Sequence, residues 1–114
     1  MMAVIFELEL QADVAPRYFE LAAALKAELE SVDGFISVER FESLTHPGRF
    51  LSLSFWRDEA AVRAWRCHGM HRNAQQEGRS QVFANYRLRV AAVVRDYGLH
   101  ERDQAPADSL GALL

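Results

Sequence analysis

The chain has 114 residues, a length that suits one domain, and half of them are apolar, which is enough for a hydrophobic core. Thirteen basic and sixteen acidic residues give a net charge of 13 − 16 = −3, which argues against nucleic-acid or anionic-membrane partners because these need a clustered basic surface. The single cysteine cannot form an intrachain disulfide. We see no signal peptide and no run long enough to cross a bilayer, so a cytoplasmic protein is expected.

The first segment of the chain predicts a strand followed by a helix. Apolar residues alternate through residues 3–10 with the two-residue period of a strand. Residues 15–31 repeat apolar side chains at spacings of three and four, which indicates an amphipathic helix. Asp13 is expected to cap this helix, and Gly34 is expected to take a left-handed conformation just after it.

The middle of the chain predicts a hairpin and a second helix. Residues 35–42 and 49–56 read as two strands, joined by a turn that contains Pro47 and Gly48. Asp58 is expected to cap a helix that runs through Trp65.

The last segments complete the pattern. Helix is predicted to resume over residues 70–82, after a kink at Gly69. Residues 85–97 predict a long final strand, whose far end is expected to reach a second copy of the chain. The order is therefore β-α-β-β-α-β, which indicates an α+β, ferredoxin-like domain: a four-stranded antiparallel sheet with helices on one face.

Alternation gives the predicted sheet two different faces. We expect the wholly apolar face to lie beneath the helices, and it comprises Phe6, Leu8, Leu51, Leu53, Phe55, Leu88 and Val90. The other face is mixed and carries Ile5, Glu7, Glu9, Ser37, Ser52, Ser54, Trp56, Arg87, Arg89, Ala91 and Val93. Its two glutamates are expected to pair with its two arginines across neighbouring strands. A second copy packed on this face would cover its apolar residues, which predicts a homodimer, the alternative being a monomer with exposed apolar surface.

Aromatic, histidine and arginine residues form a spaced pattern in the second half of the chain. It comprises Phe55-Trp56, Ala64-Trp65-Arg66, His68, His71-Arg72, Gln75, Gly78-Arg79, Phe83, Tyr86, Arg87-Leu88-Arg89-Val90 and Tyr97-Gly98. With this combination the chain resembles the antibiotic biosynthesis monooxygenase family over residues 1–98, and a tail of residues 99–114, flexible or docked on the dimer, lies outside the resemblance. The resemblance implies a dimeric α+β barrel with a pocket between helices and sheet in each protomer.

The resemblance also implies a chemistry. Members with known activity oxidise aromatic phenols or quinols with dioxygen and without metal or flavin, or they degrade haem. The haem-degrading members use an asparagine on the first strand, a tryptophan on the second helix and a histidine about three turns later. Trp65 matches the tryptophan, but Gln75 falls near the histidine position and the first strand has no asparagine. The resemblance therefore implies a small hydrophobic aromatic substrate, dioxygen and no cofactor, and these departures disfavour haem degradation.

Two residues are the candidates for catalysis. Trp65 either packs in the core or walls the pocket, where its ring can stack on a substrate. His71 is the first choice for a general base that takes the proton of a phenol, and the alternative is a purely structural histidine. His68 and His71 share a helical face, but a metal needs a third ligand and none is placed to join them, so no metal site is predicted.

Five residues are the candidates for substrate binding. Phe6 and Phe55 are expected to wall the pocket together with Trp65. Tyr86 either orients the substrate through its hydroxyl or packs in the core. Arg66 and Arg72 either clamp a phenolate or carboxylate or lie on a solvated helix face.

Three hypotheses of function remain open. The first hypothesis is a cofactor-independent monooxygenase acting on a quinol, phenol or polyketide-like aromatic with dioxygen. The second is a non-catalytic dimeric barrel that binds a small apolar ligand, and haem binding or degradation is the third.

Overall fold

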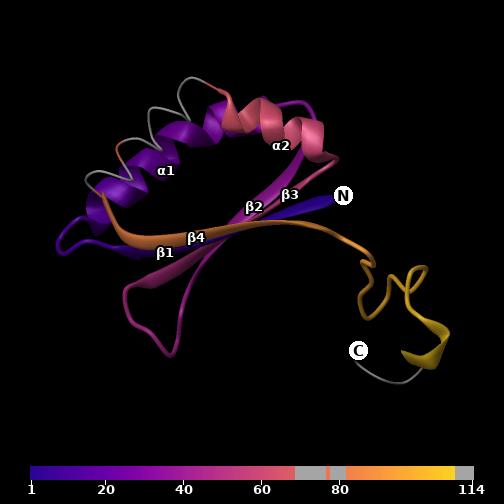
Figure 1. Cartoon of the computed structure of the whole chain (residues 1–114). Coiled ribbons are helices and arrows are strands. Elements are labelled where there is room, and N and C mark those ends of the chain that lie inside the picture. The colour runs from indigo at the N-terminus through magenta and orange to yellow at the C-terminus, as the bar shows by residue number, and fades with distance from the viewer. Residues whose placement is uncertain (69–76, 78–81, 110–114) are drawn as a thin grey trace.

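A four-stranded antiparallel sheet forms one layer of the molecule, and both helices lie on the same side of it (Figure 1). The structure is a computed structural model that describes residues 1–68, 77 and 82–109. Its main elements are β1 (Met2–Leu10), α1 (Ala15–Glu30), β2 (Phe35–Glu42), β3 (Arg49–Trp56), α2 (Glu59–Arg66) and β4 (Phe83–Ala92). The predicted β-α-β-β-α-β order is confirmed, and the sheet order β2-β3-β1-β4 places the first and last strands side by side.

The ends of the helices agree only partly with the sequence prediction. Asp58 caps α2 as predicted, because its carboxylate accepts a hydrogen bond of 2.9 Å from the backbone N–H of Ala61. Asp13 does not cap α1. It has a positive φ of 61°, and the cap position is taken by Val14 without a side-chain hydrogen bond. The loop after α1 contains Gly34 at φ 90°, in the left-handed region as predicted.

The register of the strands corrects the predicted faces of β3. Directly opposite residues in an antiparallel pair share a face, and Val4 lies opposite Ser54 and Val90. The helix-facing side therefore carries Met2, Val4, Phe6, Leu8, Phe50, Ser52, Ser54, Trp56, Tyr86, Leu88 and Val90. The prediction that Leu51, Leu53 and Phe55 lie beneath the helices is wrong, as is the prediction that Ser52, Ser54 and Trp56 face away from them.

Two hydrophobic clusters fill the space between the helices and the sheet. The tryptophan cluster consists of Leu29, Trp56, Ala61, Val62 and Trp65, with Val4 and Leu25 among the side chains packed against it. The aromatic cluster is built on Leu8, Tyr18 and Val82, with Phe6, Phe50 and Phe83 among its partly buried neighbours. Because α1 contributes to both clusters, it ties the two ends of the sheet together.

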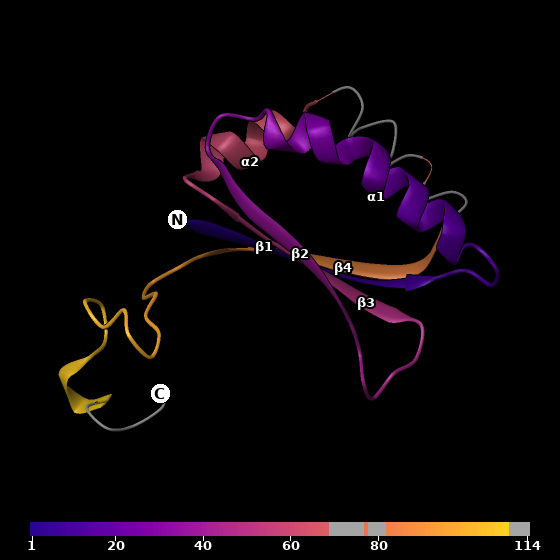
Figure 2. The same ribbon diagram turned by 180° about the vertical axis from the view of Figure 1, so that it is seen from behind.

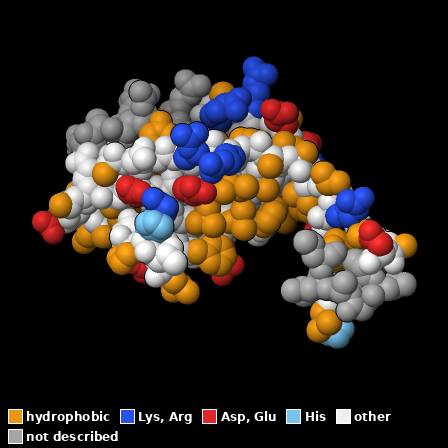
Figure 3. All heavy atoms as spheres, turned by 60° about the horizontal axis from the view of Figure 1, so that its bottom comes forward, with side chains coloured by type: hydrophobic (Ala, Val, Ile, Leu, Met, Phe, Trp, Pro, Cys, Tyr) orange, Lys and Arg blue, Asp and Glu red, His pale blue; other side chains and the backbone are white. Residues whose placement is uncertain are grey.

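The opposite side of the sheet, here called the open face, is uncovered in the single chain. Figure 3 brings this side forward and shows hydrophobic side chains gathered in one area, with charged side chains beside it. The register assigns Ala3, Ile5, Leu53, Phe55 and Ala91 to this face. The predicted cross-strand ion pair forms between Glu7 and Arg89 at 3.1 Å, whereas Glu9 pairs instead with Arg49 of β3 at 2.7 Å.

The segment after β4 stands away from the two layers in both ribbon views (Figures 1 and 2). The final strand ends at Ala92 and does not continue to residue 97 as predicted. Past this point the Val93 N–H still donates to the Met1 carbonyl at 2.9 Å. A short 3-10 helix follows at Ala107–Ser109. The helix predicted over residues 70–82 lies largely outside the described residues.

Candidate functional site

The helix-facing side of β4 carries an apolar surface that the helices leave partly uncovered. Tyr86, Leu88 and Val90 are 45%, 47% and 41% exposed, although all three point to the same side as the helices. We call these three residues the β4 strip. Val90 lies directly opposite Val4, which packs against the tryptophan cluster. The β4 strip is therefore continuous with the buried core and offers an apolar ligand a surface to cover.

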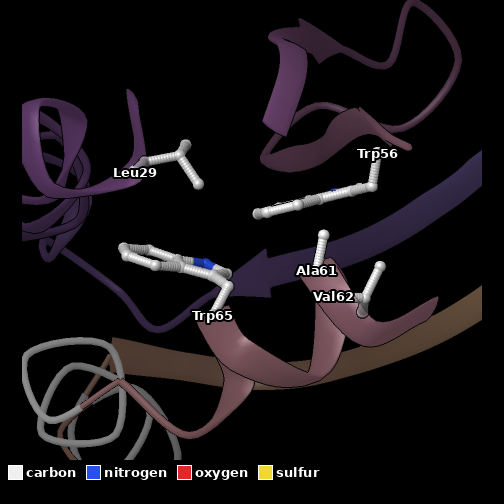
Figure 4. Packing of buried hydrophobic residues seen from close by; sticks show 5 residues of the cluster. All are labelled: Leu29, Trp56, Ala61, Val62 and Trp65. Carbon is white, nitrogen blue, oxygen red and sulfur yellow. The ribbon is translucent and has the colours of Figure 1, made fainter. Parts of the chain in front are cut away.

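Trp65 lies in the tryptophan cluster and is only 8% exposed. Its indole and that of Trp56 converge with Leu29 in the space between α1, α2 and the sheet (Figure 4). The Trp56 indole N–H donates to the buried hydroxyl of Ser54 at 2.9 Å. Trp65 therefore packs in the core, which is one of the two roles that the sequence left open. A ligand in contact with Trp65 would touch a side chain that also stabilises the domain.

Phe6 and Tyr86 are brought together by the pairing of β1 with β4. Their ring centroids are 5.8 Å apart, and Phe83 lies 5.5 Å from Phe6 in an edge-on arrangement. Such ring contacts stabilise the packing beyond the area that they bury. Phe6 and Phe83 are packed against the aromatic cluster, so they border the Tyr86 end of the β4 strip.

The other predicted site residues have different outcomes. Phe55 lies on the open face, opposite Ala3, and the prediction that it walls the pocket with Trp65 is therefore wrong. Arg66 is exposed in the last turn of α2. His71 and Arg72 lie outside the described residues, so their predicted roles stay predictions.

His68 is a further candidate for the site, and the sequence analysis considered it only for a metal site that it did not predict. Its ring lies against Trp65 with centroids 5.3 Å apart, and its Nε2 is 3.5 Å from a carboxylate oxygen of Glu28 on α1. Its Nδ1 is buried and has no hydrogen-bond partner among the described residues. The three-residue spacing of Trp65 and His68 is enough to predict that their rings are neighbours. The contact of His68 with Glu28 could not be predicted in this way, because Glu28 is distant in the sequence.

An ion-pair network fixes the entry to α2. Arg57 donates to Asp33 at 3.1 Å and to Asp58 at 3.2 Å, which links the loop after α1 to the start of α2. The N–H of Ala61 and then Arg57 lower the pKa of the Asp58 carboxyl, and Arg57 lowers the pKa of Asp33. These carboxylates stay ionised near neutral pH and hold the α2 end of the tryptophan cluster in place.

The described residues contain no group of three or more His, Cys, Asp or Glu side chains that could hold a metal ion. No helix in the described ranges combines the length and apolar character needed to span a bilayer.

The family model of the antibiotic biosynthesis monooxygenases matches residues 1–77. The chain belongs to this family. The match runs from β1 through α2, so it includes Trp65 and His68 and stops before β4.

Two curated relatives and one solved structure are similar to the chain. It is 46% identical over 93 residues to a jasmonate monooxygenase of Pyricularia oryzae, which covers 82% of this chain and 43% of the relative. It is 33% identical over 78 residues to YqjZ, an uncharacterised protein of Bacillus subtilis, and this alignment covers 68% of this chain and 67% of YqjZ. The structure of Rv0793 from Mycobacterium tuberculosis superposes with a TM-score of 0.75 at 18% identity, covering 85% of this chain and 98% of that one.

These matches settle the fold and the family. The chain spans less than half the length of the Pyricularia relative, so the activity of that whole protein does not transfer with the match. The likeness to Rv0793 supports the ferredoxin-like architecture alone.

Proposed function

We propose that the protein is a monooxygenase that oxidises a small hydrophobic aromatic molecule with dioxygen, without a metal or flavin. The β4 strip carries this proposal, because it leaves apolar side chains exposed beside the buried tryptophan cluster. A flat, apolar ring placed there would cover Leu88 and Val90 and contact aromatic side chains at the Phe6 end. Membership of the family supports the reaction class.

Oxygen consumption with a panel of phenols, quinols and anthrones tests the activity. Isotope-labelled dioxygen should appear in the product, and activity should survive dialysis against a chelator. Tight binding without oxygen consumption would favour the alternative of a non-catalytic barrel. A Soret band with added haemin, followed by bleaching with a reductant, would favour the haem alternative.

A matched pair of valines tests the place of binding. Val90→Asp puts a carboxylate on the β4 strip, whereas Val94→Asp makes the same change in the segment after β4, where the valine is 81% exposed. We expect Val90→Asp to weaken substrate binding at least tenfold and Val94→Asp to leave it unchanged. Equal effects of the two substitutions would remove the β4 strip from the site.

A second substrate class has a specific observation behind it. The 46%-identical Pyricularia relative carries the name jasmonate monooxygenase, and jasmonate is a small cyclopentanone carboxylic acid. Such a molecule would present an apolar body to the β4 strip and a carboxylate to a cation such as exposed Arg66. Jasmonate therefore belongs in the same oxygen-consumption panel, and Arg66→Gln should raise its KM without affecting that of an uncharged phenol.

The open face is proposed to pair with a second copy of the chain. Its apolar centre is bordered by the ion pairs Glu7–Arg89 and Glu9–Arg49, which gives the face the apolar core and polar rim of an interface.

We expect Leu53→Asp, on this face, to shift the protein toward monomer in sedimentation velocity. Leu44→Asp is the matched control, because Leu44 is fully exposed in the loop between β2 and β3. A monomeric wild-type protein at high micromolar concentration would overturn the pairing. We propose a cytoplasmic location for the protein. A dimer formed through the open face would not need a disulfide there.

A further inference from the structure

We infer that His68 Nδ1 accepts a hydroxyl group of the substrate and takes its proton, an inference that rests on the proposed function. His68 directly follows α2, and its backbone N–H donates to the Trp65 carbonyl at 3.0 Å. The two side chains are neighbours, with ring centroids 5.3 Å apart and planes inclined by 33°. A molecule bound beside Trp65 is therefore also beside this imidazole.

Glu28 determines which imidazole nitrogen can act as the acceptor. Its carboxylate oxygen lies 3.5 Å from Nε2, and an ionised carboxylate can only accept a hydrogen bond. The neutral ring is therefore favoured with its proton on Nε2, facing Glu28, and with a lone pair on Nδ1. Glu28 on α1 is the acidic side chain within 4.0 Å of the His68 nitrogens among the described residues, and the neighbour on α2 is the uncharged Trp65.

Among the residues that the structure describes, none supplies the donor that Nδ1 requires as an acceptor. The atom is buried, and no group in the described ranges donates to it. Buried polar atoms in folded proteins are nearly always hydrogen-bonded, and an unsatisfied one costs free energy. A ligand hydroxyl that displaces the groups covering Nδ1 would satisfy it, so the arrangement favours a hydroxylated aromatic substrate, a phenol or a hydroquinone in its neutral form.

The proton transfer follows from this arrangement. The O–H bond of the phenol breaks, its proton moves to Nδ1, and the electron pair stays on the oxygen as a phenolate. The imidazolium that forms is stabilised by the Glu28 carboxylate on its other side. No oxidant is consumed in this step, and the electron-rich phenolate is the form that reacts with dioxygen in the proposed function. His68 thus replaces His71 as the base, and Glu28 acts as a positioning residue.

The tautomer of His68 can be measured without any substrate. Long-range proton–nitrogen NMR spectra distinguish a ring protonated on Nε2 from one protonated on Nδ1, and His68→Gln identifies the signal by removing it. We expect the Nε2–H tautomer in the wild type and a mixture in Glu28→Gln. A wild-type ring with its proton on Nδ1 would overturn the inference, since that atom could then accept nothing.

The second measurement uses 4-nitrophenol, whose neutral and ionised forms absorb at different wavelengths. We expect the bound phenol to ionise at least one pH unit below the free phenol, which is about a tenfold change in its ionisation constant. His68→Gln should abolish this shift, and Glu28→Gln should reduce it. His100→Gln is the matched control, because His100 is exposed in the segment after β4. Thermal unfolding of each variant shows whether it is folded.

The outcomes separate this inference from the proposed function. A wild-type protein that binds neither nitrophenol nor any phenol of the oxygen panel contradicts the proposed function and the inference with it. Binding with an unchanged shift in folded His68→Gln contradicts the inference alone. Loss of the shift in His71→Gln but not in His68→Gln would return the role of base to His71.

Discussion

Replacing Gly34 by alanine should destabilise the fold strongly, because two separate penalties meet at this residue. The backbone there has φ 90°, where an L side chain is strained by about 1–2 kcal/mol. A Cβ added at this position would also lie 2.7 Å from the Cβ of Ala61 on α2, closer than two such atoms can approach. Relieving that overlap by moving α2 should cost roughly a further 1–3 kcal/mol.

The chain contains a control that separates the two penalties. Gly48 in the hairpin loop has nearly the same φ, 85°, and an added Cβ would meet no atom within 4 Å. Gly48→Ala should therefore show the backbone strain alone, about 1–2 kcal/mol. Gly34→Ala should cost roughly 2–5 kcal/mol, the sum of strain and overlap. The difference between the two variants measures the overlap with α2.

Equilibrium unfolding in urea, followed by the fluorescence of the buried tryptophans, is the suitable assay. Ala61→Gly provides a third variant, which removes the Cβ that Gly34→Ala would strike and itself costs about 1 kcal/mol as a glycine inside a helix. In a double-mutant cycle the two substitutions should therefore couple favourably. If Gly34→Ala proved no more destabilising than Gly48→Ala, or if the cycle showed no coupling, the close approach of this loop to α2 would be refuted.

Three further predictions concern the core and the charged groups. Trp65→Ala should lose about 3–5 kcal/mol of unfolding free energy, because a large buried ring is deleted, so Trp65→Phe is the variant for activity assays. The N–H of Ala61 lowers the folded pKa of Asp58, so its stabilising effect is present above its unfolded pKa of about 3.9 and is lost as the pH falls through the folded value. When the pH is lowered, the urea midpoint of Asp58→Asn should thus fall less than the urea midpoint of the wild type. Arg89→Met removes the half-exposed pair with Glu7 and should change the unfolding free energy by less than about 1 kcal/mol.

The order of elements was predictable because each element has its own local signal. The alternation of β1 and the amphipathic pattern of α1 follow from periodicity. The cap at Asp58 follows from residue type, because a short acidic side chain before a helix can reach the free N–H groups of its first turn. Asp13 has the same chemistry and failed as a cap because its left-handed backbone does not place the side chain over α1.

The faces of β3 could not be predicted from hydropathy. This strand reads Arg49–Trp56, and apart from Arg49 both of its alternating sets hold large apolar residues. Phe50 and Trp56 occupy one set and Leu53 and Phe55 the other, so neither set is the polar one. Which set faces the helices is determined by tertiary packing, in which Trp56 contacts the cluster that contains Ala61 and Trp65 of α2. The error in placing Phe55 in the site follows directly from this ambiguity.

Part of the candidate site depends on contacts between residues far apart in the chain. Glu28 and His68 are forty residues apart, and they meet only because α1 and α2 lie on the same side of the sheet (Figure 1). Neither residue type nor local spacing indicates that pair. The buried Nδ1 of His68 is likewise a property of packing, which a sequence pattern does not contain.

The exposure of β4 links the two proposals about this protein. β4 is an edge strand, and nine of its ten residues are exposed in the single chain, although it pairs with β1 over most of its length. Its open side carries Arg87 and Arg89, charges that discourage edge-to-edge association, yet a second copy on that face would still cover neighbouring Ala91. Its helix-facing side is the β4 strip, where a substrate would cover what the helices leave bare. On the two proposals each side of β4 has an occupant, a second copy on one side and a substrate on the other, and because the sides differ in charge we expect the two occupants to differ in chemistry.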